Sequence, residues 1–221
     1  MCGRYTLTSP EEALRRLFGY GGPAINLPAR YNVVPTQEMP VVRRGANSPR
    51  ALVRMRWGLV PGWARDAGGA AKMKNARAET LAEKPSFRDA LARRRCLVPA
   101  DGFFEWSTKA GEKRPYFVGF DDRRPFAMAG LWERWTGGDT PLVTFTVVTT
   151  AASETLNAIH HRMPVILPPE DFDAWLDVDG TTVVAAQALL RSFEAPDFAA
   201  RPVSTRVNDA RNDDPSVLEA A

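Results

Sequence analysis

The chain has 221 residues, of which 44% are hydrophobic and 25% charged, a composition typical of a folded globular protein with a sizeable core. No apolar run approaches the ~20 residues of a bilayer-spanning helix, and the N-terminus lacks the charged-then-apolar pattern of a secretory signal, so we expect a cytoplasmic protein with no membrane contact. The net charge of +3 is modest, and two distant cysteines with two adjacent histidines predict no disulfide framework, no metal and no cofactor.

A short helix is expected near the N-terminus. Residues 9–12 (SPEE) have the pattern of a capping box with proline at the first helical position, and residues 13–18 supply an apolar face that ends near Gly19. Residues 20–50 are rich in Gly, Pro and Asn, which predicts mostly loop with one strand at 41–43. Residues 51–57 alternate apolar side chains with arginine, which predicts a strand with one basic face.

The rest of the chain mixes helices with strands of antiparallel type. A Pro/Gly/Ala-rich stretch covers residues 61–75. Strands are expected at 96–98, 103–106, 116–120, 126–132 and 142–150, and helices at 86–94, 152–159, 170–176 and 182–192. No repeat or linker divides the chain, so we predict a single α+β domain over residues 1–221.

Charge is unevenly distributed along the sequence. Residues 50–95 contain twelve Lys/Arg and four Asp/Glu, whereas residues 170–221 contain four and eleven. A basic middle segment suits an anionic partner, and arginine, which outnumbers lysine 24 to 5, suits phosphate oxygens. The codon bias of a GC-rich genome explains the arginines equally well, so charge alone does not decide the function.

The chemistry-bearing feature at the N-terminus is Cys2. Cysteine at position two is small enough for removal of Met1, which would leave an amine and a thiol on adjacent carbons. Their ordinary pKa values, about 8 and 8.5, give both groups some nucleophilic form near neutrality. Such an aminothiol reacts with an aldehyde first through a Schiff base and then through closure of a thiazolidine ring. Taken alone, a cysteine after Met1 is more often incidental.

Eight segments, which follow one another from the N-terminus to residue 164, give a specific resemblance. They are CGRY (2–5), YNVVP (31–35), WGLVP (57–61), NARAET (75–80), RCLVPA (95–100), GFFEW (102–106), AGLW (129–132) and HHRMP (160–164). In these segments and their order the chain resembles the SOS-response-associated peptidase (SRAP) family, which shields abasic sites in DNA. The resemblance implies an antiparallel sheet or barrel-like core flanked by short helices, and covalent capture of abasic sites in single-stranded DNA during the DNA damage response.

By the same resemblance, the reacting residues are Cys2, Asn75, Glu105 and His160. His160 would protonate the ring oxygen of the closed sugar and expose its aldehyde. Glu105 would accept a proton from the amine, and its aromatic neighbours in the sequence predict partial burial with a raised pKa, although a surface carboxylate is the alternative. Asn75 would hold the sugar hydroxyl or the terminal backbone without adding charge.

Residues expected to bind DNA also lie in the matching segments or near them. Three arginines would bind phosphates, two tryptophans would stack on bases, and two polar residues belong to a C-terminal family segment: Arg4, Arg77, Arg162, Trp63, Trp106, Ser204 and Asn208. A place in the core is nearly as good an interpretation for Trp63. The chain departs from the family at His161, where an acidic or amide residue is common, and Cys96 is expected to be an inert strand residue.

Two other functions stay open at this point. An N-terminal-cysteine hydrolase, either a peptidase or an amidohydrolase, is the first, because Met-Cys-Gly also opens glutamine-dependent amidotransferases. A non-covalent single-strand binding module is the second, although it has no need of a cysteine at position two. For the leading hypothesis we further expect a monomer that associates with the nucleoid when bound to DNA, with weak lyase activity and removal of Met1 by the protein itself or by an aminopeptidase.

Overall fold

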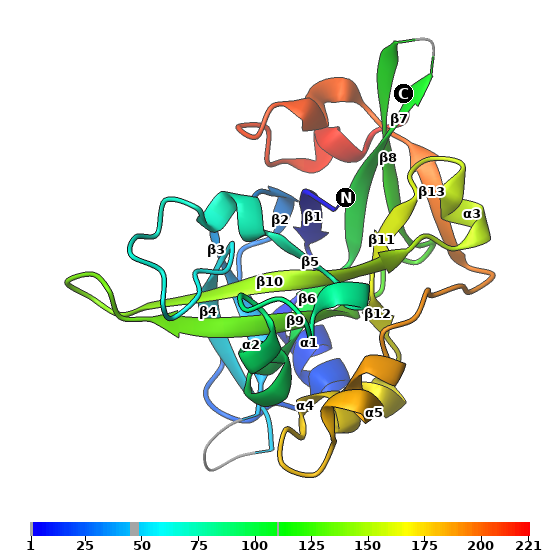
Figure 1. Cartoon of the computed structure of the whole chain (residues 1–221). Coiled ribbons are helices and arrows are strands. Elements are labelled where there is room, and N and C mark those ends of the chain that lie inside the picture. The colour runs from blue at the N-terminus through cyan, green and yellow to red at the C-terminus, as the bar shows by residue number, and fades with distance from the viewer. Residues whose placement is uncertain (1, 45–48, 110) are drawn as a thin grey trace.

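Two β-sheets contain the strands of the computed structural model, which describes residues 2–44, 49–109 and 111–221 (Figure 1). The first sheet has the order β13-β8-β7-β1-β2, with bounds Phe198–Pro202, Glu112–Phe120, Gly102–Lys109, Arg4–Leu7 and Arg30–Val33. The second comprises β3 (Glu38–Arg43), β4 (Ala51–Trp57), β5 (Asn75–Arg77), β6 (Arg95–Ala100), β9 (Phe126–Trp135), β10 (Leu142–Ala151), β11 (Arg162–Pro164) and β12 (Ile166–Leu167).

Five strands of the second sheet close into a barrel. β10 pairs with β9 and with β4, and the pairings β4–β3, β3–β6 and β6–β9 complete the ring. Among the five pairings of this ring, only β4–β10 is parallel. A closed ring removes the exposed edges that would otherwise invite pairing with other chains. The barrel-like core implied by the family resemblance is confirmed.

Alternation along β4 shows how the sequence fills this barrel. Met55 and Trp57 are buried, whereas Arg54 is exposed, as the predicted basic face requires. The Trp57 ring stacks on Phe145 of β10 with 6.3 Å between ring centroids. Its indole Nε1 also donates a hydrogen bond to the carbonyl oxygen of Lys74, so the indole binds the residue that immediately precedes β5.

The helices are short and lie around the two sheets (Figure 1). They are α1 (Glu11–Phe18), α2 (Arg88–Arg93), α3 (Glu154–Asn157), α4 (Phe172–Leu176) and α5 (Val183–Ala188), with 3-10 turns η1 (Ala70–Met73), η2 (Ala78–Thr80), η3 (Pro169–Asp171), η4 (Thr205–Asn208) and η5 (Pro215–Leu218). All five helical regions expected from the sequence contain a helix, and the α+β class is confirmed. Four of these helices, α2, α3, α4 and α5, are shorter than predicted, and the 3-10 turn η3 precedes α4 directly.

The predicted capping box at the start of α1 is wrong. Pro10 occupies the N-cap position, and no side chain caps this end of the helix. The backbone N–H and the hydroxyl of Ser9 instead donate to Oδ2 of Asp101, at 2.8 and 3.2 Å. Asp101 is only 2% exposed and also accepts from the hydroxyl of Thr8, so it needs these donors to satisfy its buried charge. The left-handed Gly19 ends the helix as expected.

The expectation of a mostly irregular segment at 20–50 is also wrong in part. It contains β2 and a β3 that is longer than the predicted strand, while residues 45–48 of that expected loop lie outside the described residues. The short strands β1, β5, β11, β12 and β13 were not predicted. Each of these strands has two to five residues, too few for a clear alternation, and tertiary pairing determines their conformation.

Within the described residues, no helix has the length and apolar character needed to span a bilayer. The same part of the chain has no cluster of three or more His, Cys, Asp or Glu residues arranged to hold a metal ion.

Candidate active site

The first sheet brings Cys2 next to Glu105. β1 pairs antiparallel with β7, with Arg4 opposite Phe104 and Tyr5 opposite Phe103. Continued by one pair, this register sets Gly3 opposite Glu105. Cys2 is fully buried and Glu105 is only 4% exposed. Strand pairing between residues a hundred positions apart therefore places a thiol and a carboxyl in one water-poor region.

Asn75 reaches the same region from the barrel. It begins β5, which runs parallel to β10 with Asn75 opposite Val147. Its Nδ2 donates a hydrogen bond of 2.6 Å to the carbonyl oxygen of Cys2. Its buried Oδ1 accepts no hydrogen bond from the described part of the chain. Asn75 therefore holds the terminal backbone, one of the two roles predicted for it.

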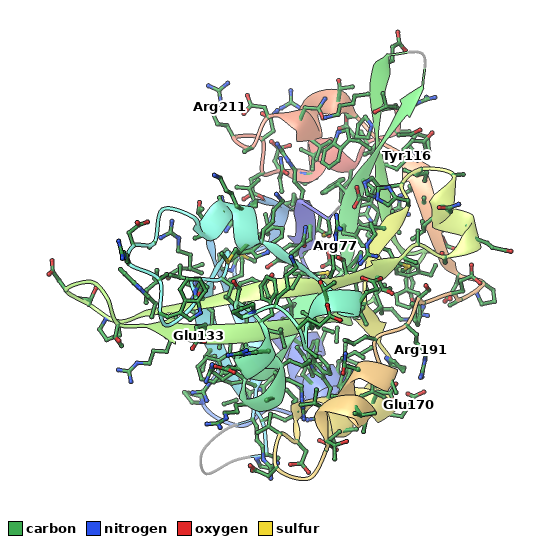
Figure 2. All side chains as sticks on the ribbon, viewed as in Figure 1. Arg77, Tyr116, Glu133, Glu170, Arg191 and Arg211 are labelled. Carbon is green, nitrogen blue, oxygen red and sulfur yellow. The ribbon has the colours of Figure 1, made fainter. Side chains whose placement is uncertain are left out.

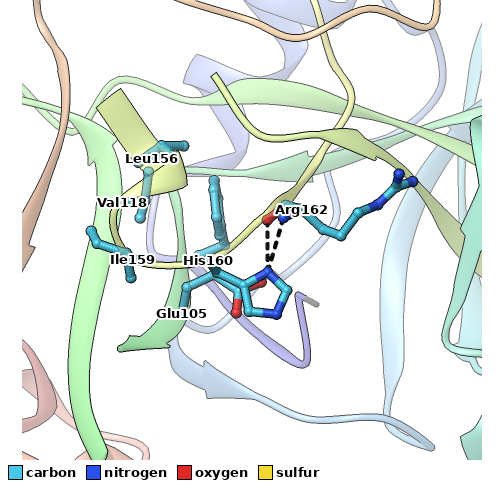
Figure 3. A pocket seen from close by; sticks show the side chains of 7 residues that line it. Glu105, Val118, Leu156, Ile159, His160 and Arg162 are labelled. Atoms are coloured by element: carbon cyan, nitrogen blue, oxygen red, sulfur yellow. Dashed lines mark hydrogen bonds between the residues drawn. The ribbon is translucent and has the colours of Figure 1, made fainter. Parts of the chain in front are cut away.

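His160 completes the group from the loop between α3 and β11. The histidine and Glu105 line one narrow pocket, whose other lining residues are Phe103, Val118, Leu156, Ile159 and Arg162 (Figure 3). The ring Nδ1 lies 3.0 Å from the backbone N–H of Arg162 and 3.2 Å from its carbonyl oxygen. One ring tautomer accepts from the former and the other donates to the latter, so the Arg162 backbone fixes the ring in either form.

The Cys2 thiol is not activated in this position. Burial raises its pKa far above the usual value, and the Glu105 carboxylate raises it further, whereas the positive amino-terminal charge and Lys74 act in the opposite direction. The thiol donates a weak hydrogen bond to the carbonyl oxygen of Arg4 at 3.7 Å. At neutral pH the sulfur is therefore protonated.

The pKa values of Glu105 and His160 are shifted toward each other. Burial raises the pKa of the Glu105 carboxyl, although the amino-terminal charge lowers it. Burial lowers the pKa of the His160 imidazole, as do the amino-terminal charge and the Arg162 guanidinium, against the hydrogen bond to the Arg162 backbone. A smaller difference between the two pKa values makes proton transfer within the site less costly. The burial and raised pKa predicted for Glu105 are thus both present.

His161 does not line the pocket, although its charge lowers the pKa of Glu105. Its side chain is exposed, and its ring stacks on that of His160 with 4.5 Å between centroids. The positive form of His160 lowers the pKa of His161, because two cations in contact repel. The adjacent imidazoles are therefore unlike in their surroundings, and only His160 lines the pocket with Glu105.

Four of the residues predicted to bind DNA meet at the C-terminal segment. Arg4 donates to the carbonyl oxygens of Val207 and Asn208 and to Oδ1 of Asn32 at 3.1 Å. The Trp106 indole donates to Oδ1 of Asn208 at 2.8 Å. The Arg4 guanidinium also lies over the Trp106 ring, at 5.8 Å from its centroid. Ser204 caps η4 by accepting from the N–H of Arg206. These contacts fold the C-terminal segment against β1.

The remaining three predicted DNA-binding residues differ in exposure. Trp63 is 66% exposed, which contradicts the alternative of a core tryptophan. Arg77 is exposed at the end of β5, where that strand runs beside β10 (Figure 2). The Arg162 side chain is only 11% exposed and forms an ion pair with Glu79 at 2.6 Å. Trp63 and Arg77 are thus accessible to a ligand, whereas Arg162 is already bound.

A basic pocket adjoins Asn75 and was not predicted as such. Its volume is about 400 Å³, within the usual range of ligand sites. The lining residues are Lys72, Met73, Asn75, Arg77, Thr80, Lys84, Ser86 and Phe87. The positive excess over residues 50–95 was the signal that could have located it. The predicted strands and helices did not indicate that Lys72 and Lys84 line the same pocket as Asn75.

Cys96, expected to be inert, is a fully buried residue of β6, and burial raises the pKa of its thiol far above the usual value. It also lies in the barrel rather than in the first sheet, so it takes no part in the site around Cys2. Residue 1 lies outside the described residues, so the expected loss of Met1 stays a prediction.

Comparison with known proteins identifies the family of this chain. The family model described as SOS response associated peptidase (SRAP) matches residues 1–210. The chain belongs to the SRAP family. The match spans the whole region that brings Cys2, Asn75, Glu105 and His160 together, and it confirms the resemblance seen in the eight sequence segments.

Relatives of this SRAP chain occur in bacteria and vertebrates. The chain is 40% identical over 225 residues to a protein of Bacillus subtilis named abasic site processing protein YoqW, and the match covers all of both chains. It is 37% identical to a Gallus gallus protein named abasic site processing protein HMCES, with 85% of this chain and 65% of that protein covered.

Solved structures of similar fold are also known. A protein from Bacteroides thetaiotaomicron superposes with a TM-score of 0.89 at 28% identity over the full length of both chains. A protein from Bordetella bronchiseptica gives a TM-score of 0.79 at 27% identity, with 92% of this chain and 100% of that chain covered. The two-sheet arrangement of this SRAP chain is therefore shared with experimentally determined structures.

Proposed function

We propose that this chain captures abasic sites in single-stranded DNA by forming a covalent bond through Cys2 after Met1 has been removed. The observation that carries the proposal is the convergence of Asn75, Glu105 and His160 on the N-terminal cysteine from three separate parts of the chain. The family and the names of its relatives as abasic site processing proteins support the same conclusion.

The reaction joins an aldehyde to an aminothiol. The freed amine of Cys2 attacks the aldehyde carbon of the opened deoxyribose, a C–N bond forms, and one water leaves as the Schiff base appears. The Cys2 sulfur then adds to the same carbon, and its proton passes to the nitrogen as the C–S bond closes the thiazolidine ring. The balance is one aldehyde and one aminothiol giving one thiazolidine and one water. No oxidant or reductant is required.

Each neighbouring residue has a task that fits its position. Asn75 holds the carbonyl group of Cys2 and so fixes the direction of the amine. Glu105, whose pKa is raised by burial, accepts the proton that the amine must lose before attack and returns it to the departing water. His160, in the pocket with Glu105, protonates the ring oxygen of the closed sugar.

The buried thiol suits the second step rather than the first. Because its pKa is raised, the sulfur does not compete with the amine for the aldehyde. Once the Schiff base has formed, the sulfur and the imine carbon belong to one small ring closure, which needs no encounter from solution. The low water content around Cys2 and Glu105 also protects the Schiff base from hydrolysis.

The DNA strand would lie along the exposed basic side of the site. Arg77 and the basic pocket offer positive charge directly beside Asn75, and Trp63 offers an exposed ring for stacking. Arg4, Trp106, Ser204 and Asn208 would supply further contacts from the C-terminal segment, with the charge of Arg4 two residues after the cysteine. Arg162, the remaining predicted contact, is held in its ion pair with Glu79.

Two side activities belong to the same proposal. A Schiff base acidifies the neighbouring sugar carbon, so β-elimination would give weak lyase activity before the ring closes. Removal of Met1 would precede both, either by the protein itself or by an aminopeptidase. A peptidase restricted to its own first residue would not require a separate substrate-binding cleft.

A denaturing gel tests the proposal. The purified protein is mixed with a single-stranded oligonucleotide that contains one abasic site, and a shifted band that survives denaturation is expected. Cys2→Ala must abolish this band, and Cys96→Ala, which alters only a distant buried thiol, serves as the matched control. If no Cys2-dependent band forms, the covalent mechanism is wrong. A non-covalent complex that Cys2→Ala retains would then indicate a single-strand binding module instead.

A further inference from the structure

The Arg162 guanidinium is held on its outer side by Glu79. Its two terminal nitrogens donate to the two carboxylate oxygens of Glu79, at 2.6 and 3.0 Å, and one of them also donates to the carbonyl oxygen of Thr149 at 2.6 Å. This two-pronged geometry is the strongest arrangement available to an arginine and a carboxylate. The Glu79 carboxyl has a lowered pKa because of this hydrogen bond, so it stays ionised.

The ion pair connects β11, which contains Arg162, to η2, which contains Glu79 and directly follows β5. β5 and β11 each have only three residues. β5, which begins with Asn75, pairs with one edge of β10, and β11, which follows His160, pairs with the other. Thr149 of β10 is the common residue, because it lies opposite Arg77 of β5 and opposite Pro164 of β11. Few backbone hydrogen bonds hold strands of this length, so a side-chain link between them has a large share in fixing their relative position.

We propose that Glu79 is a positioning residue, which holds Arg162 so that the segments carrying Asn75 and His160 keep a fixed separation across β10. The backbone N–H and carbonyl group of Arg162 in turn fix the His160 ring. The role in the reaction rests on the proposed function of the site. The structural link itself concerns only residues of this chain.

Charge gives this arrangement a measurable signature at His160. Burial lowers the pKa of its imidazole most, and the amino-terminal charge and the Arg162 guanidinium lower it further, while the Glu105 carboxyl lies in the same pocket. His161 stacks on the ring, and Arg77 acts on His161 in turn. Glu79 partly neutralises Arg162. Removing the Glu79 charge therefore strengthens the effect of Arg162 and lowers the pKa of His160 further.

An NMR titration tests the link without DNA. The chain has only two histidines, so the ring carbon-bound protons of His160 and His161 can be assigned with a single His161→Asn variant. Glu79→Gln is expected to lower the pKa of His160 relative to the parent protein. The matched control is Glu83→Gln, which removes the same charge from an exposed residue close by in the chain. A His160 that titrates in Glu79→Gln as in the parent protein overturns the inference.

Crosslinking kinetics test the consequence for the reaction. Glu79→Gln is expected to slow adduct formation about tenfold at saturating abasic oligonucleotide, with unchanged affinity for DNA that contains a tetrahydrofuran analogue, because orientation rather than binding is lost. Tighter DNA binding and faster adduct formation overturn the inference, because they mean that Glu79 competes with phosphate for Arg162. Glu79→Asp retains the charge, so the pKa of His160 in this variant is expected to lie near the parent value. A clearly different pKa of His160 in Glu79→Asp counts against the proposal, even if Glu79→Gln does not fold.

The two proposals fail in different ways. If the parent protein forms no adduct at all, the covalent function is wrong, and the NMR titration still decides whether Glu79 sets the environment of His160. If the parent protein forms the adduct and Glu79→Gln equals it in both rate and His160 titration, only the positioning role is wrong.

Discussion

Replacing Asn75 with alanine removes the hydrogen bond from Nδ2 to the carbonyl oxygen of Cys2, 2.6 Å away, while β5 keeps its backbone pairing with β10. A neutral hydrogen bond of this kind contributes about 1 kcal/mol, which corresponds to a roughly fivefold change in rate if it serves only to orient the amine. A displacement of the amine by about 1 Å would raise the loss toward 100-fold. We therefore expect Asn75→Ala to crosslink about 5- to 100-fold more slowly than the parent protein.

The assay is a single-turnover reaction with protein in excess over abasic oligonucleotide, quenched at intervals and resolved on a denaturing gel. Varying the protein concentration separates the limiting rate from binding. Asn157→Ala is the matched control, because Asn157 is exposed at the end of α3 and lies outside the site. Asn75→Asp keeps the shape but has no N–H donor, so it should be at least as slow as Asn75→Ala. A limiting rate for Asn75→Ala equal to that of the parent protein would refute the orienting role.

Three further predictions concern proton transfer, the exposed tryptophan and the backbone. Burial raises the pKa of Glu105 in the folded chain, so its contribution to stability is present below the ordinary value of 4.5 and is lost as pH rises through the folded pKa. Glu105→Gln should therefore raise Tm at pH 7 but not at pH 4, and slow crosslinking about 100-fold or more. A calorimetric Tm at pH 7 that falls instead contradicts this. Trp63→Ala should change the free energy of unfolding by no more than about 0.5 kcal/mol, because Trp63 is 66% exposed. The same variant should bind gapped DNA more weakly by about 1–3 kcal/mol, as measured by fluorescence anisotropy. An unchanged affinity would exclude stacking of the Trp63 ring on a base. Gly58→Ala should lower the free energy of unfolding, measured by urea denaturation, by at least about 2 kcal/mol. Gly58 has a φ of 116°, and a Cβ there would lie 2.5 Å from the carbonyl oxygen of Ala70. A loss below ~0.5 kcal/mol would mean that the loop relaxes to accept the side chain.

Much of the fold was accessible from the sequence because it depends on local patterns. The apolar face before Gly19 predicted α1, and alternation in residues 51–57 predicted β4 together with its buried and exposed sides. The family segments also located Cys2, Asn75, Glu105 and His160, and the structure brings these residues together. Their reacting roles stay predictions until the experiments above are done.

The rest depends on contacts between distant parts of the chain. Ser9 had the residue type of a helix cap, but the buried Asp101 needs its donors more, and nothing near Ser9 in the sequence indicates this. The ion pair that holds the Arg162 side chain joins it to Glu79, which lies 83 positions earlier, and no local pattern indicates that contact. β5 and β11 were missed because three residues give no alternation, and only pairing with β10 makes them strands.

Intact-mass analysis of the crosslinked product tests the central claim most directly. The parent protein is incubated with abasic oligonucleotide, denatured, treated with iodoacetamide and weighed. The account predicts a product whose mass equals protein without Met1 plus oligonucleotide minus one water, with a single alkylated thiol, that of Cys96, because the Cys2 sulfur lies in the ring. A product that retains Met1, or one in which both cysteines are alkylated, would contradict it.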